Sequence, residues 1–165
     1  MSGRTAPAPA RHARLSRVVL EGEALSRLSP LQEADRAQAV ADLAAGNRFA
    51  PSGTAAGPFV LHLSIYEGRL VFDIREEDDR PLSGVVLALG PFRRLIKDYQ
   101  LLVDSYATAI EEGREARIQA IDMGRRGLHN EGAELMTQRL HGKIDIDFET
   151  ARRLFTLLCV LHQRI

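Results

Sequence analysis

The sequence has one cysteine, no tryptophan and only two lysines, Lys97 and Lys143. A single cysteine cannot form a disulfide within the chain, and Cys159 lies in the apolar run LFTLLCVL. We therefore predict a buried, unreactive thiol. That run is much too short to cross a bilayer, and the first residues include arginines but no hydrophobic segment typical of a secretory signal. We expect a cytoplasmic protein that does not enter membranes.

An excess of either charge is also missing, because 22 Lys and Arg residues balance 22 Asp and Glu residues. A surface that binds nucleic acid usually needs a basic face and aromatic side chains on which bases stack. Aromatic residues make up only 5% of this chain. Nucleic acid is therefore not the expected partner, and a nucleic-acid-binding protein is the last of three functional alternatives.

Several motifs that carry known chemistry do not occur in the sequence. These are the phosphate-binding loop G-x-x-x-x-G-K, the nucleophile elbow G-x-S-x-G and the dinucleotide-binding loop G-x-G-x-x-G. A helical zinc site needs two histidines four residues apart with a glutamate beside the first. Here the residue four positions after His129 is Ala133. We expect no metal site and no cofactor.

A length of 165 residues predicts one domain with a sizeable core. The first residues, MSGRTAPAPARHAR, are rich in Pro, Ala and Arg and contain little that could be buried. Residues 1–14 are therefore predicted to be a disordered basic tail. Residues 15–165 are predicted to form a single domain.

A change of period marks a β-hairpin in the first half of the chain. Large apolar residues occupy every second position in FVLHLSIY (59–66), from Phe59 to Ile65, and again in RLVFDIR (69–75), from Leu70 to Ile74. The intervening Glu67-Gly68 predicts a two-residue turn, which fixes the register of the two strands. In that register the apolar side chains share one face, and His62 lies opposite Asp73 as a predicted structural ion pair.

The other elements complete an α+β fold. SGVVLALG (83–90) predicts a third antiparallel strand, RVVL (17–20) a short strand, and KIDI (143–146) a short strand or extended link. The fold class is α+β: a three-stranded antiparallel meander packed against three to four helices, with a C-terminal half that is mostly helical.

Helix boundaries are marked by capping residues. Ser29 as N-cap and Pro30 at the first helical position predict a helix that ends at Gly46. After Pro91 the apolar residues recur at helical spacing, and Asp147 is the predicted N-cap of the last helix.

The stretch from 118 to 141, IQAIDMGRRGLHNEGAELMTQRLH, gathers most of the polar chemistry. Its interior glycines, at positions 124, 127 and 132, each cost a helix roughly 1 kcal/mol relative to alanine, which favours a functional site. At about 100° per residue, Arg125 falls inside the apolar stripe. A buried Arg125 needs a carboxylate partner, and Asp122 is the nearest in sequence. Arg126 and His129 lie with Asp122 at the edge of the stripe, Glu131 borders the opposite edge, and Asn130 points away.

Four blocks of the sequence resemble a known family. They are RLVFDIREED, PFRRLIKDY, AIDMGRRGLHNEGAELM and FETARRLFTLLCVLHQR, which occur in this order between Gly57 and the C-terminus. The sequence is similar to uncharacterised protein family 0262 of the UPF series, a bacterial and chiefly alphaproteobacterial family without an assigned function. The resemblance implies a small bacterial domain and brings no catalytic residue or cofactor with it.

Two further functional alternatives follow from the residues. The favoured interpretation is a non-enzymatic binding or regulatory module in which Arg125, Arg126, His129, Asn130 and Glu131 bind an anionic small molecule or a protein partner. The second is an enzyme acting on an anionic substrate, with His129 as general acid or base, Glu131 or Asp122 orienting it and Arg126 stabilising negative charge. A homodimer formed through the glycine-bearing helix is an additional alternative for the partner.

Overall fold

The structure, a computed structural model, describes residues 12–53 and 56–162. Of the tail predicted for residues 1–14, positions 1–11 lie outside this described part. The last residues of the predicted tail pack on the domain. Ala13 is buried, and its carbonyl oxygen accepts a hydrogen bond from the Phe49 amide. The packed chain therefore starts before Leu15, the boundary expected from composition.

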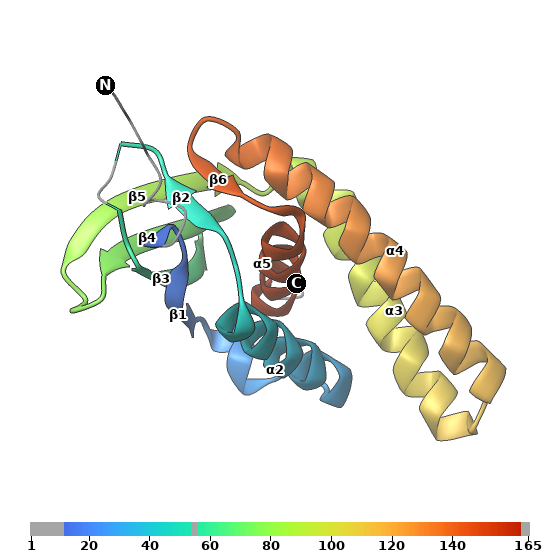
Figure 1. Ribbon diagram of the computed structural model, residues 1–165. Helices are drawn as coiled ribbons and strands as arrows, with labels where there is room; N and C mark the ends of the chain where they lie inside the picture. The colour runs from blue at the N-terminus through green and yellow to red at the C-terminus, as the bar shows by residue number, and fades with distance from the viewer. Residues whose placement is uncertain (1–11, 54–55, 163–165) are drawn as a thin grey trace.

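The main sheet has four strands in the order β1-β3-β4-β5 (Figure 1). Their bounds are β1 (Leu15–Glu21), β3 (Phe59–Tyr66), β4 (Arg69–Glu76) and β5 (Pro81–Ala88). Strands β3, β4 and β5 form the predicted antiparallel meander. Strand β1, which the sequence predicts only as a short strand, lies parallel to β3. The sheet is therefore mixed, and the α+β class is confirmed.

The hairpin between β3 and β4 has the predicted register, with Tyr66 opposite Arg69. Glu67 and Gly68 both have positive φ angles, 48° and 72°, as a two-residue turn that follows the strand twist requires. This register places the apolar side chains on one face, where they are almost completely buried: Leu61, Leu63, Leu70, Phe72 and Ile74.

The ion pair predicted for His62 is wrong, although the register that suggested it is right. His62 lies opposite Asp73, but its Nε2 atom is 3.1 Å from Asp79 Oδ1. The Asp73 carboxylate instead accepts hydrogen bonds from Arg75. The hydrogen bond with His62 is the main cause that holds the pKa of Asp79 below its usual range. Register alone could not show this partner, because Asp79 belongs to the loop that follows β4.

Four α-helices are present in the part of the chain that the structure describes. Ser29 caps the first with a reciprocal pair of hydrogen bonds to Gln32, and the Asp147 side chain accepts a hydrogen bond from the Thr150 amide at the start of the last. Both N-caps are therefore confirmed. The helices are α2 (Pro30–Ala45), α3 (Arg93–Glu112), α4 (Glu115–Leu140) and α5 (Phe148–Leu161).

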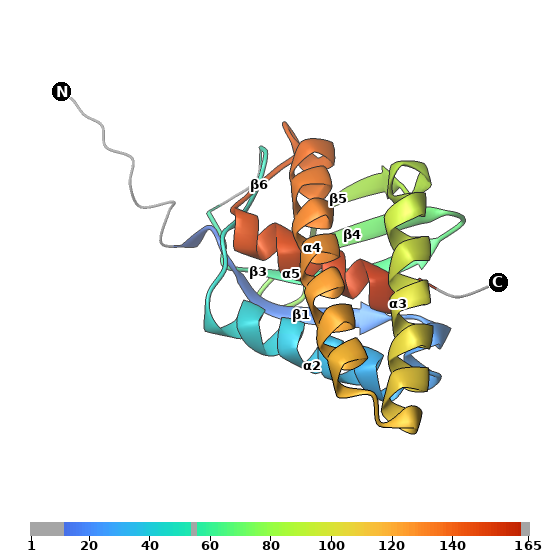
Figure 2. The same cartoon turned by 90° about the vertical axis from the view of Figure 1, so that its right-hand side faces the viewer.

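Helix α5 is the central element of the molecule. It runs between the sheet and the α3–α4 pair, with α2 beside it (Figures 1 and 2). Ten of its residues are buried, among them Cys159, which has no exposed surface. Burial raises the pKa of this thiol, so the prediction of a buried cysteine is confirmed.

Short elements connect these layers. Strand β2 (Phe49–Pro51) pairs antiparallel with β6 (Ile144–Ile146) and so ties the start of α5 to the end of α2. The 3-10 turns η1 (Glu23–Ser26) and η2 (Gly90–Phe92) precede α2 and α3. Within residues 12–53 and 56–162, no helix combines the length and the apolar character needed to cross a membrane.

Candidate functional site

Helix α4 is continuous through the three glycines, and their surroundings differ. A Cβ atom at Gly132 would come within 3.0 Å of the Phe155 ring on α5, a separation that Cβ atoms essentially never show. A Cβ at Gly124 would lie 3.6 Å from the Leu102 side chain, and one at Gly127 would meet no atom within 4 Å. Close packing between α4 and α5 therefore requires glycine only at position 132.

Arg125 of α4 is partly buried and links this helix to α2. Its Nη1 donates a hydrogen bond to Asp35 Oδ1 on α2, and its Nη2 donates one of 3.1 Å to Asp122 Oδ1. The Tyr99 hydroxyl donates to the other Asp35 oxygen over 2.8 Å. Burial raises the pKa of Asp35, and the Arg125 charge opposes that shift. The predicted partner Asp122 is therefore confirmed, and Asp35 is a second partner that the sequence did not indicate.

His129 lies in the core, with 5% of its surface exposed. Its ring centroid is 6.1 Å from that of Tyr99 and 6.2 Å from that of Phe155. Its Nε2 atom is buried without a hydrogen-bond partner among the described residues. Burial lowers the pKa of His129 to about 3, and the nearby charges of Arg152 and Arg125 act in the same direction. The imidazole is therefore neutral at pH 7 and shielded from solvent.

Arg126, Asn130 and Arg152 form a surface cluster, here called the α4–α5 arginine surface. The Nε atom of Arg152 on α5 donates a hydrogen bond of 2.8 Å to Asn130 Oδ1 on α4. Burial is the main cause that lowers the pKa of Arg152; the charges of Arg153, Arg125 and Arg126 lower it further, and the Glu149 carboxylate opposes them. Arg126 is exposed, and its charge is close enough to Arg152 to lower the pKa of that guanidinium.

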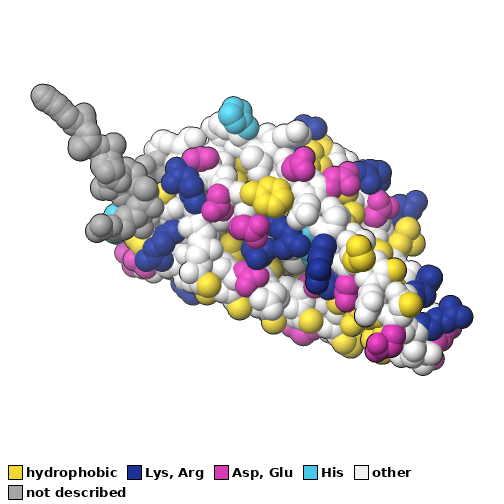
Figure 3. Space-filling view, turned by 45° about the vertical axis from the view of Figure 1, so that its right-hand side comes forward, with side chains coloured by type: hydrophobic (Ala, Val, Ile, Leu, Met, Phe, Trp, Pro, Cys, Tyr) yellow, Lys and Arg dark blue, Asp and Glu magenta, His cyan; other side chains and the backbone are white. Residues whose placement is uncertain are grey.

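The arginines around this surface differ in how their charge is balanced. Arg153 lies 2.8 Å from Asp42 and 3.1 Å from Glu149, and Arg125 also has two carboxylate partners. Within the described chain, no carboxylate lies at ion-pairing distance from Arg126 or from Arg152. Figure 3 shows one face of the molecule, on which basic and acidic side chains are interspersed and form no broad basic field.

Glu131 belongs to a different surface. Its carboxylate pairs with Arg94 on α3, and Arg94 also donates a hydrogen bond of 3.1 Å to Asp98. On a helix, Glu131 lies about 140° around the axis from Arg126. The predicted site residues therefore fall into three groups: Arg125 and His129 inside, Arg126 and Asn130 facing α5, and Glu131 facing α3.

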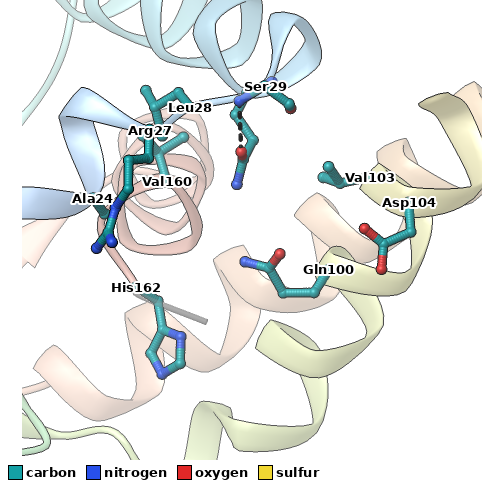
Figure 4. Close-up of a pocket in the computed structure, with 10 residues that line it drawn as sticks. Ala24, Arg27, Leu28, Ser29, Gln100, Val103, Asp104, Val160 and His162 are labelled. Atoms are coloured by element: carbon teal, nitrogen blue, oxygen red, sulfur yellow. Dashed lines mark hydrogen bonds between the residues drawn. The ribbon is translucent and has the colours of Figure 1, made fainter. Parts of the chain in front are cut away.

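A cleft between η1, α3 and the end of α5, here called the α3 cleft, was not expected from the sequence. It consists of two adjoining cavities of about 550 and 730 Å³, which share Gln100, Asp104 and His162. Figure 4 shows the smaller cavity, with Arg27 from the end of η1 and His162 from the end of α5 around it, and Gln100 and Asp104 from α3. Arg93 and Lys97 of α3 line the larger cavity.

One signal in the sequence could have located this cleft. Arg93 and Lys97 lie in the first two turns of α3, and the first turn contains no acidic residue. Because the helix macrodipole is positive at the N-terminus, cations there are unfavourable. By helical spacing alone, both side chains fall on the polar face of an amphipathic helix.

No group of three or more His, Cys, Asp or Glu side chains is arranged to hold a metal ion in the described part of the chain. His129 is too deeply buried and too weakly basic to bind one readily, since a histidine ligand must offer an accessible ring nitrogen. The α4–α5 arginine surface is positively charged and would repel a metal cation.

Comparison with known sequences finds one matching family model and several relatives of the same family. It matches Uncharacterised protein family (UPF0262) over residues 12–164. It is 71% identical to a UPF0262 protein of Granulibacter bethesdensis, over 98% of this chain and 96% of the relative. It is 66% identical to a UPF0262 protein of Acidiphilium cryptum, over 92% and 93%, and 52% identical to one of Maricaulis maris, over 92% and 94%. No solved structure matches the chain.

Proposed function

This chain belongs to Uncharacterised protein family (UPF0262), and because that family has no assigned activity, we propose a function from the geometry: a non-enzymatic binding module for an acidic segment of a partner protein. The binding site in this proposal is the α4–α5 arginine surface of Arg126, Asn130 and Arg152. Arg125 and His129 help to fix the position of α4 through their contacts with the neighbouring helices, and Glu131 helps to hold α4 against α3.

The observation that carries the proposal is the charge balance of neighbouring arginines. Arg125 and Arg153 each have two carboxylate partners. Among the described residues, no carboxylate lies at ion-pairing distance from Arg126 or Arg152, and Glu149 acts on Arg152 only from farther away. Two adjacent guanidinium groups repel each other, and a bound carboxylate would relieve that repulsion. Guanidinium groups suit this task because their planar donors match a carboxylate with two parallel hydrogen bonds.

The shape of this surface favours a protein segment over a small molecule. Arg126 and Asn130 are exposed and Arg152 is partly exposed, whereas small molecules usually bind in concave, enclosed sites. The bond from Arg152 to Asn130 holds the guanidinium in place. A side chain that is already oriented loses less entropy when it binds, so this arrangement is suited to a partner that contributes several carboxylates.

The surroundings of His129 weigh against the enzymatic alternative. A general base works best when its pKa is near the operating pH, whereas burial lowers the pKa of His129 to about 3. Asp122 is bound to Arg125 and Glu131 to Arg94. In the described structure, neither carboxylate is hydrogen-bonded to the imidazole. The arrangement therefore lacks the oriented base that the alternative requires.

A fluorescein-labelled hexaglutamate peptide tests the proposal by fluorescence anisotropy. The wild-type chain should bind it, and the double variant Arg126→Ala/Arg152→Ala should bind about tenfold more weakly. Tenfold corresponds to about 1.4 kcal/mol, or about 0.7 kcal/mol for each of two exposed ion pairs. Binding should weaken as salt is added, because exposed charges are screened.

A matched control separates a specific surface from net charge. Arg117 and Arg139 are exposed on the same helix and have no ion-pair partner within the described residues. The variant Arg117→Ala/Arg139→Ala removes the same charge and should bind like the wild type. Equal weakening in both double variants would mean that the peptide senses only net charge, and the proposed surface would then be rejected.

A further inference from the structure

The α3 cleft has the size and form of a ligand site. Its larger cavity is about 730 Å³, within the range of roughly 300–1,000 Å³ that is common for small-molecule pockets. It shares three lining residues with the smaller cavity, and His162 is one of them. The Nδ1 atom of His162 is buried and has no hydrogen-bond partner among the described residues.

The charge of the cleft is unbalanced. Among the described residues that line the two cavities, Arg27, Arg93 and Lys97 are cations and Asp104 is the one carboxylate. These four described side chains carry an excess of two positive charges. Arg93 and Lys97 are exposed, and in the described part of the chain neither lies at ion-pairing distance from a carboxylate.

The position of Arg93 and Lys97 on α3 adds to this imbalance. Both lie near the N-terminus of a helix of 20 residues, where the macrodipole is itself positive. No acidic residue in the first turn offsets it. This arrangement disfavours the helix, and a bound anion would reverse the effect. Gly90, in the turn before the helix, also lines the cavity and leaves its backbone accessible.

The other wall of the larger cavity is apolar. Leu89, Ile96 and Leu101 line it, and Leu101 keeps 55% of its surface exposed. A large aliphatic side chain at such a site gains free energy if a ligand removes it from water. The cavity therefore combines a cationic end with an apolar wall, and a ligand that fits both has a charged head and an apolar body.

We propose that the α3 cleft binds a small amphipathic anion, with its carboxylate or phosphate head on Arg93 and Lys97 and its apolar body against Leu89, Ile96 and Leu101. The His162 ring borders the inner end of the ligand. This site does not depend on the proposed function, because it shares no residue with the α4–α5 arginine surface.

The dye 8-anilinonaphthalene-1-sulfonate, an amphipathic anion that fluoresces in apolar surroundings, is a direct probe of this site in the full chain. The wild type should enhance its fluorescence, and octanoate and octyl phosphate should displace it. The variant Arg93→Gln/Lys97→Gln should bind the dye at least tenfold more weakly. Leu101→Gln should also weaken binding, because it removes part of the apolar wall.

Octylamine, which has the same tail and a positive head, should not displace the dye. Displacement by octanoate alone would identify a carboxylate ligand, and by octyl phosphate alone a phosphate ligand. Both outcomes support the site. Displacement by octylamine as readily as by the anions would overturn the proposal.

Two control variants complete the design. Arg117→Gln/Arg139→Gln removes the same charge elsewhere and should leave dye binding unchanged, as should Arg126→Ala/Arg152→Ala. If Arg117→Gln/Arg139→Gln weakens dye binding as much as Arg93→Gln/Lys97→Gln does, the cleft is not the binding site. Urea unfolding shows whether each variant is folded. Arg93→Gln/Lys97→Gln should unfold at the same or a higher urea concentration, because it removes unfavourable cations from the start of α3.

Discussion

Replacing Gly132 with alanine should destabilise the domain, although alanine is the better helix former. Gly132 is buried on α4, and its missing side chain makes room for the Phe155 ring of α5. Phe155 is itself fully buried and stacks at 6.3 Å between ring centroids on Phe92. The ring cannot move away without disturbing a second aromatic side chain, so the added methyl group strains the packing between α4 and α5.

The magnitude follows from two opposing contributions. Overpacking a well-filled core typically costs about 1–3 kcal/mol and occasionally more, and three ring atoms in the forbidden range place this substitution toward the upper end. Alanine in place of glycine inside a helix contributes about 1 kcal/mol in the other direction. We expect Gly132→Ala to lower the free energy of unfolding by about 1–2 kcal/mol, the difference of these contributions.

Gly127 provides the matched control, because it lies on the same helix and a Cβ there meets no atom within 4 Å. Gly127→Ala should raise the free energy of unfolding by up to about 1 kcal/mol. The helix-propensity gain is common to both variants, so the difference between them measures the overpacking cost alone. Urea unfolding followed by circular dichroism gives both values from the midpoints, provided that the slopes agree.

A second substitution tests whether the Phe155 ring causes the cost at position 132. In a Phe155→Leu background the ring is gone, so Gly132→Ala should cost less than it does in the wild type, which is a coupling between two residues in contact. If Gly132→Ala and Gly127→Ala are equally stable, or if Phe155→Leu leaves the cost unchanged, the proposed packing constraint on Gly132 is wrong.

Three further predictions concern the buried polar groups. Because the pKa of His129 falls from 6.5 to about 3 on folding, the unfolded chain binds the proton more tightly between these values, and stability is lost as the pH falls. From pH 7 to pH 5 the wild type should lose about 2 kcal/mol more than His129→Leu, at 1.36 kcal/mol per pKa unit, and equal losses in urea unfolding would contradict this. Asp35→Asn should lower the free energy of unfolding by about 3 kcal/mol, because it removes the buried carboxylate partner of Arg125. Asp122→Asn should lower it by less than about 1 kcal/mol, because the Asp122 side chain is 38% exposed. Thermal unfolding should show the larger loss for Asp35→Asn, and the reverse order would refute the assignment. Cys159 should react with Ellman's reagent only in denaturant, because it is fully buried with a raised pKa, whereas rapid reaction of the native chain would exclude this packing.

The sequence determined the features that depend on neighbours along the chain. The Glu67-Gly68 turn and the alternation of apolar residues fixed the register of β3 and β4, because a slip of one residue would turn every apolar side chain outward. The N-caps Ser29 and Asp147 were likewise readable, since a capping side chain bonds to the amide two or three residues ahead. The pairing of Arg125 with Asp122 followed from a separation of three residues on one helix.

Pairings between distant segments could not be predicted in this way. A short strand such as β1 has no local feature that selects its neighbour, and only the finished fold places it parallel to β3. Asp35 lies 90 positions from Arg125 in sequence, so its role depends on how α2 packs against α4. The sequence also could not show which glycine of α4 is constrained, because the constraint comes from Phe155 on another helix.

The candidate site also combines features that local sequence determines with features that only the packing of helices determines. The sequence identified α4 as the helix that carries the polar residues, but the prediction placed Glu131 in the same site as Arg126, whereas the structure pairs Glu131 with Arg94 on α3. The structure decided which of these residues are accessible. His129 is buried, Arg125 is partly buried and held by two carboxylates, and Arg126 and Asn130 are exposed near Arg152 of α5. The α3 cleft has walls from three elements far apart in the chain. Local sequence determines which side chains an element presents, and only the packing of elements determines whether they are buried, paired or open to a ligand.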